Sequence, residues 1–106
     1  APSSGPVTFA GYTLDLEARE VTKPDGAPVS FTRTEFDLLA YLLKRQGRAL
    51  TRDDILDEVW GRDLVVDPRT VDNFISSLKK KLGWTRKSAF RIHTVRGVGY
   101  RMEVDE

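Results

Sequence analysis

Cysteine is absent from this chain of 106 residues, which also has only one histidine and one methionine. The chain therefore has no disulfide bond, no thiol nucleophile and no cysteine-ligated zinc, and a reducing cytoplasm is its expected compartment. Long apolar runs are missing as well, because the longest, Leu38–Leu43, has six residues, where a membrane span needs about twenty. We expect a domain that does not cross a membrane and is held together by its core.

An excess of one charge sign is also missing, since 17 Lys+Arg and 16 Asp+Glu leave a net charge of +1. The charges are nevertheless separated along the chain. Residues 53–67 hold six acidic residues and one arginine, whereas Arg69–Arg101 holds nine basic residues and one acid, a local charge of +8. Any attraction to a polyanion must come from this basic segment rather than from the total charge.

Patterns typical of enzymes are absent too. His93 lies in an alternating strand, and no nucleophile or metal-ligand spacing accompanies it. Asp53 and Asp54 fit the start of a helix, where acidic side chains complement the macrodipole, and Gly97-x-Gly99 does not form a phosphate-binding loop. We predict no catalytic residue, no metal site and no cofactor.

The first six residues, Ala1-Pro2-Ser3-Ser4-Gly5-Pro6, have the composition of a linker, and the chain does not start with methionine. We interpret residues 1–6 as a linker remnant and residues 7–104 as one folded domain cut from a longer polypeptide. Within it, residues 7–31 contain short β-type runs, with a turn at Pro24-Asp25-Gly26. The alternation of Tyr12, Leu14 and Leu16 predicts an antiparallel sheet with one buried face.

Three helices are predicted after the sheet. The capping box Thr32–Glu35 starts a helix from Arg33 to Gln46, with Gly47 as its stop, and its apolar residues cover nearly the whole circumference. A shorter helix begins at Thr51 and ends at Gly61. Asp67-Pro68 starts a third helix to Leu82. Alternating residues 90–95 and 100–104 then predict a β-hairpin.

The third helix has two distinct stripes. Its apolar stripe comprises Val71, Phe74, Ile75, Leu78 and Leu82. Its polar stripe comprises Arg69, Asn73, Ser76 and Lys80, flanked by Thr70 and Ser77. Basic side chains suit phosphates and small polar ones suit base edges, so this stripe suits a DNA major groove. A solvated surface helix has the same appearance, so the helix alone leaves both interpretations open.

The hairpin tip bears on this choice. Gly97 and Gly99 permit a tight tip from which Arg96 projects, a shape that fits a minor groove. A plain turn also uses such glycines. Beside a basic helix, however, the tip favours DNA binding.

Several motifs in order resemble one family. Thr34-Glu35-Phe36-x-Leu38-Leu39, Val59-Trp60-Gly61, Arg69-Thr70-Val71-Asp72 and Thr94-Val95-Arg96-Gly97-x-Gly99-Tyr100 strongly resemble the OmpR/PhoB family of response-regulator effector domains, over Val7–Val104. The resemblance implies an α+β winged helix-turn-helix with an N-terminal four-stranded antiparallel sheet, three helices and a C-terminal hairpin wing. The third helix, about residues 68–82, would enter the major groove.

The resemblance also implies the DNA contacts. Phosphate or base contacts would come from Arg69, Thr70, Asn73, Ser76, Ser77 and Lys79, to which the stripe adds Lys80; Trp60, Thr94 and Tyr100 would lie against the DNA backbone, and Arg96 would reach the minor groove. Many relatives carry arginine where this sequence has Ser77, so a bidentate contact to guanine is missing there and base preference does not transfer.

By the same resemblance, the chain is the output domain of a two-component transcription regulator. An absent N-terminal receiver domain would be phosphorylated by a sensor kinase and would pair two copies on double-stranded DNA, whereas the isolated domain would be a monomer. The long connection Gly61–Asp67 would touch RNA polymerase through Leu64, Val65 and Val66, although these residues could equally pack onto the domain, and repression also fits. A protein-interaction module that binds an acidic partner is the alternative.

Overall fold

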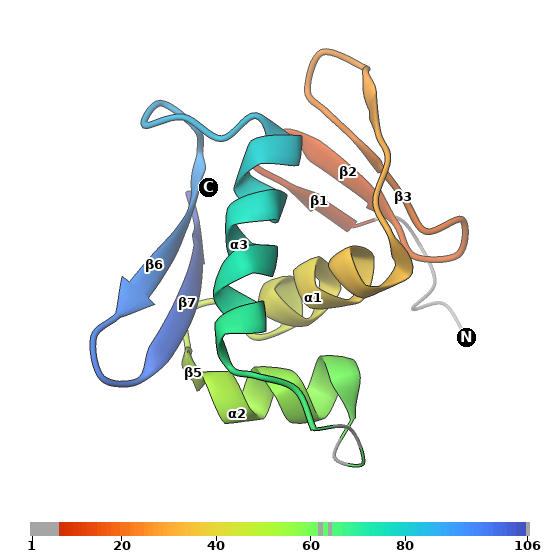
Figure 1. Cartoon of the computed structure of the whole chain (residues 1–106). Coiled ribbons are helices and arrows are strands. Elements are labelled where there is room, and N and C mark those ends of the chain that lie inside the picture. Colours follow the sequence, from red (N-terminus) through yellow and green to blue (C-terminus); the bar gives the residue numbers. More distant parts are fainter. Residues whose placement is uncertain (1–6, 62, 64, 106) are drawn as a thin grey trace.

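The computed structural model describes residues 7–61, 63 and 65–105, so the linker predicted at residues 1–6 lies outside the described residues. A four-stranded sheet, three helices and a hairpin follow one another as predicted (Figure 1). The elements are β1 (Val7–Phe9), β2 (Tyr12–Asp15), β3 (Glu20–Thr22), β4 (Pro28–Val29), α1 (Arg33–Lys44), β5 (Ala49–Thr51), α2 (Arg52–Ile55), η2 (Leu56–Trp60), α3 (Arg69–Leu82), β6 (Phe90–Val95) and β7 (Gly99–Val104).

The N-terminal sheet is antiparallel, in the order β1-β2-β3-β4. Its predicted buried face is confirmed for Tyr12 and Leu14, whereas Leu16 lies just beyond β2 and is half-buried. The Tyr12 hydroxyl donates a hydrogen bond of 2.5 Å to the carbonyl oxygen of Leu82. The Tyr12 ring also stacks on Phe9, with centroids 5.1 Å apart. These contacts fix the sheet against the end of α3.

Helix α1 begins as the capping box predicts. The Thr32 amide donates to Glu35 Oε1 at 2.9 Å, and the Glu35 amide donates to Thr32 Oγ1 at 3.3 Å. The helix ends at Lys44, two residues before the predicted Gln46, because the chain turns toward β5, and the amide of Gly47 (φ 85°) donates to Met102.

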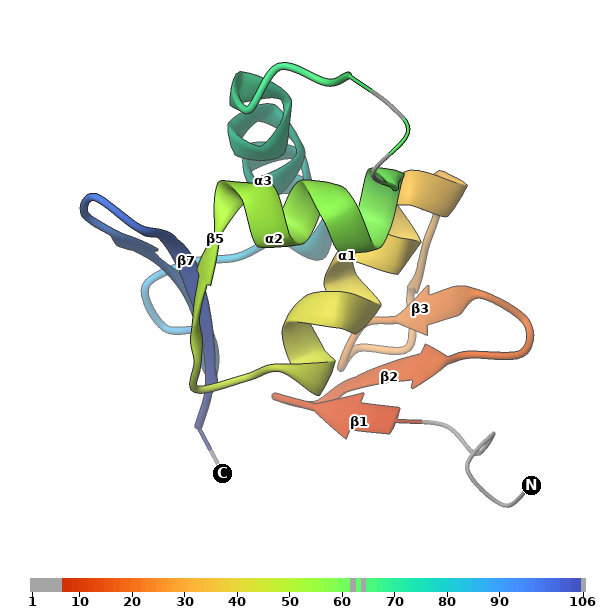
Figure 2. The same ribbon diagram turned by 90° about the horizontal axis from the view of Figure 1, so that it is seen from below.

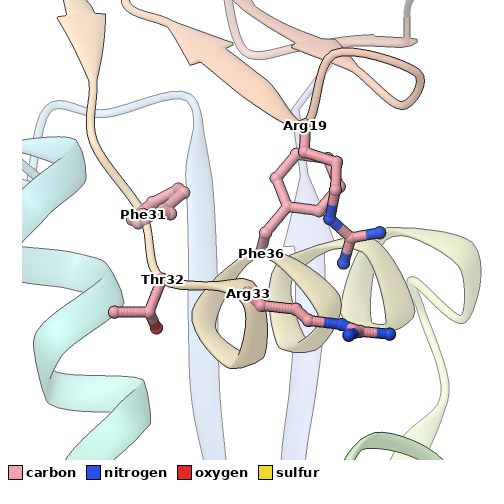
Figure 3. A pocket seen from close by; sticks show the side chains of 5 residues that line it. All are labelled: Arg19, Phe31, Thr32, Arg33 and Phe36. Carbon is pink, nitrogen blue, oxygen red and sulfur yellow. The ribbon is translucent and has the colours of Figure 1, made fainter.

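The turn between β2 and β3 contacts the start of α1. The guanidinium of Arg19 lies over the Phe36 ring, 5.0 Å from its centroid, and forms an ion pair with Asp37. Figure 3 shows Arg19 and Phe36 together at the rim of a hollow that also includes Arg33 and Thr32. This contact ties the turn between β2 and β3 to the start of α1.

The second helix has an internal change of geometry that the sequence pattern did not predict. It opens with a capping box in which the Asp54 amide donates to Thr51 Oγ1 at 2.9 Å. After Ile55 the hydrogen bonds widen to a π-helical segment, which ends at Gly61 as expected. Apolar spacing cannot distinguish these two helical forms over so few residues.

The C-terminal sheet has three strands rather than the two of a hairpin, in the order β5-β7-β6. Strand β5 was not predicted, because it has three residues of which only Leu50 is buried. Gly99 lies opposite Thr51, and a Cβ at this position would collide with the carbonyl oxygen of Leu50. Glycine is therefore required at Gly99 for close strand pairing, in addition to any role in the hairpin tip.

Seen from below, α3, the connection after α2 and the tip of the β6–β7 hairpin lie toward one side of the molecule (Figure 2). The four-stranded sheet and the α1–β5 connection lie on the other side (Figure 2). The arrangement is the predicted winged helix-turn-helix, with the hairpin as the wing. None of the described helices is long and apolar enough to cross a membrane.

Candidate nucleic-acid interface

Helix α3 has the two stripes that its sequence predicts. Val71, Ile75, Leu78 and Leu82 are buried, and Phe74 is half-buried. All four residues of the polar stripe are exposed: Arg69, Asn73, Ser76 and Lys80. The helix starts where Asp67 Oδ1 accepts a hydrogen bond of 2.9 Å from the Arg69 amide, and it stops at Gly83 with a φ of 69°. A continuous polar face is therefore presented to solvent.

One cluster at the C-terminal half of α3, which we call the inner clamp, consists of Glu35, Ser77 and Lys81. Glu35 is 5% exposed. Its carboxylate accepts hydrogen bonds from Ser77 Oγ at 3.0 Å and from Lys81 Nζ at 2.6 Å, in addition to the one from Thr32. Burial alone would raise the pKa of Glu35, but these hydrogen bonds outweigh it and lower the pKa. The inner clamp joins α3 to the start of α1.

A second cluster, the outer clamp, consists of Arg52, Asp72 and Tyr100. Asp72 Oδ1 accepts a hydrogen bond of 2.9 Å from Arg52 Nε and another from the Tyr100 hydroxyl. The Arg52 guanidinium also lies 5.3 Å from the centroid of the Tyr100 ring. The hydrogen bond from Tyr100, followed by that from Arg52, lowers the pKa of Asp72 against the effect of burial. The outer clamp joins the first turn of α3 to α2 and β7.

The wing tip carries Arg96, which is exposed, next to Gly97 with a φ of 77°. The Val98 amide closes the turn by donating to the carbonyl oxygen of Val95 at 3.0 Å. Thr94 precedes the tip and is also exposed. The tip therefore presents a cation to solvent.

Other predicted contact residues differ in exposure. Trp60 is half-buried and packs edge-on against Phe74, with ring centroids 5.1 Å apart. Thr70 and Lys79 are half-buried at the flanks of the polar stripe. Tyr100 is 6% exposed. The hydroxyls of Ser77 and Tyr100 are both taken by carboxylates of the domain itself, so the DNA contacts predicted for these two residues stay predictions.

The connection predicted to touch RNA polymerase contains one fully exposed apolar residue, Val65, at 104% of its reference area. Val66 is half-buried, and Leu64 lies outside the described residues. Val65 thus does not pack back onto the domain, which was one of the two alternatives. Whether it contacts a partner stays a prediction.

Sequence reasoning missed the roles of three charged residues. The sequence predicts Glu35 only as part of a helix cap, and it predicts no contact for Arg52 or Asp72. Their pairings join residues 20 to 46 positions apart in the chain, and helical periodicity reveals only contacts within one helix. Across residues 7–61, 63 and 65–105, no group of three or more His, Asp or Glu side chains could hold a metal ion.

Known proteins resemble this chain over nearly its whole length. The family described as "Transcriptional regulatory protein, C terminal" matches residues 26–102. Transcriptional regulatory protein TrcR of Mycobacterium tuberculosis is 43% identical over 105 residues, which cover 99% of this chain and 40% of TrcR. The chain thus spans about two fifths of the length of that curated relative.

Solved structures agree with this result. The DNA-binding domain of Klebsiella pneumoniae RstA, in complex with RstA box, is 33% identical with a TM-score of 0.78, over 92% of this chain and 96% of that one. Response regulator DrrB of Thermotoga maritima, described as an OmpR/PhoB homologue, is 27% identical with a TM-score of 0.79, over 93% of this chain and 44% of that one.

Proposed function

Because the chain belongs to the family of C-terminal domains of transcriptional regulatory proteins, of the OmpR/PhoB type, we propose that it binds double-stranded DNA in a sequence-specific manner. One observation carries the proposal: α3 and the wing tip lie toward the same side of a winged helix (Figure 2), and α3 has an exposed polar stripe while the tip has the exposed Arg96. Both belong to the basic segment Arg69–Arg101. Helix α3 enters the major groove, and the wing enters the neighbouring minor groove.

The residues of the interface have different tasks in this proposal. Arg69, Lys79 and Lys80 bind phosphates, and Asn73 and Ser76 approach base edges. Thr70, Thr94 and Trp60 lie along the backbone, and Arg96 enters the minor groove. Ser77 and Tyr100 act mainly by holding α3 in place, since Glu35 and Asp72 occupy their hydroxyls. Because α3 has two serines in place of longer side chains, some of its contacts to base edges are mediated by water.

The regulatory role extends the proposal to the whole protein. We infer that a full-length protein with this domain is a cytoplasmic response regulator, whose receiver domain is phosphorylated by a sensor kinase. The isolated domain is a monomer, and two copies occupy adjacent half-sites about one helical turn apart. The exposed side chain of Val65 supports a contact between the connection after α2 and RNA polymerase when the protein activates transcription.

A competition titration tests the DNA-binding function. The domain is titrated with a labelled duplex carrying its operator, found by selection from a random pool, and is then challenged with unlabelled operator or scrambled duplex. We expect the operator to compete at least 1,000-fold better, within the usual specificity range of about 10³–10⁷. If selection enriches no sequence and the domain binds an acidic protein tightly, the protein-interaction alternative is supported instead.

The wing is tested separately with Arg96→Ala. If Arg96 makes a groove contact, the variant should bind its operator about 1 to 3 kcal/mol more weakly. Because Arg96 is exposed, the unfolding curve of the variant should match that of the wild type. Unchanged affinity would remove the wing from the mechanism while leaving α3 in it.

A further inference from the structure

A basic groove of about 470 Å³ lies between the C-terminal half of α3 and strand β6. Three basic side chains line it, together with Trp84 and His93: Lys79, Arg86 and Arg91. Thr94, which leads to the wing tip, belongs to the same lining. Of these residues, only Lys79 and Thr94 belong to the predicted interface, so Arg86 and Arg91 have no assigned task.

The groove has a fixed wall formed by the start of the loop after α3. Trp84 Nε1 donates a hydrogen bond of 2.7 Å to the carbonyl oxygen of Phe90, and the Trp84 amide donates one of 2.9 Å to the carbonyl oxygen of Lys79. The ammonium of Lys79 lies 5.1 Å from the centroid of the Trp84 ring. This cation–π contact holds a positive charge at the groove without neutralising it.

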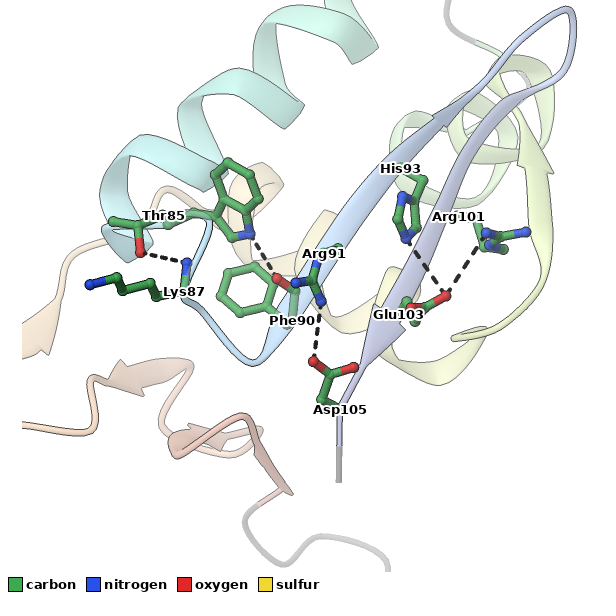
Figure 4. Close-up of polar contacts among 9 residues, drawn as sticks. Thr85, Lys87, Phe90, Arg91, His93, Arg101, Glu103 and Asp105 are labelled. Atoms are coloured by element: carbon green, nitrogen blue, oxygen red, sulfur yellow. Dashed lines mark hydrogen bonds and ion pairs between the residues drawn. The ribbon is translucent and has the colours of Figure 1, made fainter.

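The two arginines reach the groove from different elements. Arg86 is exposed on a turn in which the Thr85 amide donates to Ser88 Oγ, and the Ser88 amide donates to the Thr85 carbonyl oxygen, both at 3.0 Å. Arg91 on β6 forms an ion pair of 3.1 Å with Asp105, shown in Figure 4. Both side chains of this pair are more than a third exposed, and such pairs are weak. An incoming phosphate can therefore replace Asp105 as the partner of Arg91.

B-DNA geometry indicates which part of a bound duplex would lie in this groove. One sugar–phosphate backbone separates each major groove from the adjacent minor groove. If α3 lies in one and the wing tip in the other, that backbone crosses between α3 and β6, where the basic groove lies. We propose that Arg86 and Arg91 bind phosphates of this backbone and extend the interface beyond Lys79. This proposal rests on the proposed function.

The test uses the domain and a random-sequence duplex about two helical turns long, because phosphate contacts do not need the operator. The variants are Arg86→Gln, Arg91→Gln and the double variant, with Arg48→Gln as the control. Arg48 is exposed and belongs to the α1–β5 connection, a segment that Figure 2 shows away from α3. The control loses the same charge. Dissociation constants are measured between 50 and 200 mM salt.

Each lost phosphate contact should make the log–log salt slope shallower by about 0.9, so that the loss of affinity across this fourfold salt range shrinks about 3.5-fold per contact. The double variant should have a slope shallower by about 1.8, so that the loss of affinity across this range shrinks about 12-fold, and Arg48→Gln should show neither change. Asp105→Asn provides a test of opposite sign, since it releases Arg91 and should tighten binding.

The outcomes separate this proposal from the function on which it rests. If the wild type binds DNA but the double variant has the same salt slope, the proposed role of the groove is wrong and DNA binding stands. The same holds if Asp105→Asn does not increase the affinity. A wild-type domain that binds neither this duplex nor any selected sequence would overturn DNA binding and the groove together.

Discussion

The inner and outer clamps hold the same helix in different ways. In the inner clamp, a buried carboxylate joins α3 to α1 through Ser77 and Lys81. In the outer clamp, the side chains of Arg52 and Asp72 are 33% and 39% exposed, and Asp72 joins α3 to α2 and the wing. Buried ionised groups are costly to leave unpaired, whereas exposed pairs contribute little.

This difference predicts that the inner clamp mainly stabilises the fold and that the outer clamp mainly places α3. The inner clamp lies where α3 meets the core, so its loss should affect folding. The outer clamp connects α3 to α2 and to strand β7 of the wing, so its loss should change the placement of α3 relative to the wing more than the stability of the domain. Four predictions test this division.

The largest effect is expected for Glu35→Ala. The variant loses the N-cap hydrogen bond of α1 and leaves Ser77 and Lys81 without their acceptor, which should lower the free energy of unfolding by about 2 to 4 kcal/mol. Glu35→Gln keeps an acceptor oxygen and should lose about half as much. Urea denaturation at pH 7 measures both. If both variants lose the same small amount of unfolding free energy, the inner clamp does not hold α3.

A smaller loss of stability is expected for Asp72→Asn. Because this pair is partly exposed, the free energy of unfolding should fall by about 1 kcal/mol. Binding to DNA should weaken by more than this loss of stability explains, since Tyr100 and Arg52 lose the carboxylate that places α3 relative to the wing. Denaturation and anisotropy titrations of the same variant separate the two effects. A loss of stability alone would contradict the division of tasks.

The pH dependence of stability provides a third comparison. The pKa values of Glu35 and Asp72 are lower in the folded domain than in ordinary carboxyl groups. Each therefore stabilises the fold fully above its unfolded pKa of about 4, and this contribution disappears as the pH falls through the folded pKa. The wild type should lose stability below about pH 5, and Glu35→Gln should lose less over the same range. A wild type that gains stability on acidification would contradict this account.

The smallest effect is expected at the pair Arg19–Asp37, which joins the turn between β2 and β3 to helix α1. Its side chains are 44% and 38% exposed, and neither contacts α3 through the clamps. Asp37→Asn should cost less than about 1 kcal/mol and should leave DNA affinity unchanged. A loss as large as that of Glu35→Ala would remove the distinction between buried and exposed pairs.

Much of the fold could be predicted because its signals are local. The capping box at Thr32, the stop at Gly83 and the two stripes of α3 each depend on residues within a few positions. Strand β5 could not be predicted, because its three residues become a strand only by pairing with β7. The sequence predicts Gly99 as part of a tight hairpin tip, but the close approach of the Leu50 carbonyl oxygen that requires glycine there depends on the same pairing.

The candidate site was predicted in part for the same reason. Exposure of the polar stripe follows from helical periodicity, and the exposed tip at Arg96 follows from a local turn. The engagement of Ser77 by Glu35 joins residues 42 positions apart, and the burial of Tyr100 depends on how the hairpin packs. Neither contact leaves a pattern within one element, so the sequence predicts a surface more readily than the contacts that support it.

The salt dependence of DNA binding tests the central claim most directly. With about five to eight phosphates neutralised by the basic segment, a plot of log affinity against log salt should have a slope between about −4.5 and −7. The measurement needs only the wild-type domain, one duplex and anisotropy titrations at several salt concentrations. Such a slope is the result we predict, and an affinity that does not change with salt would contradict the assignment of this surface to DNA.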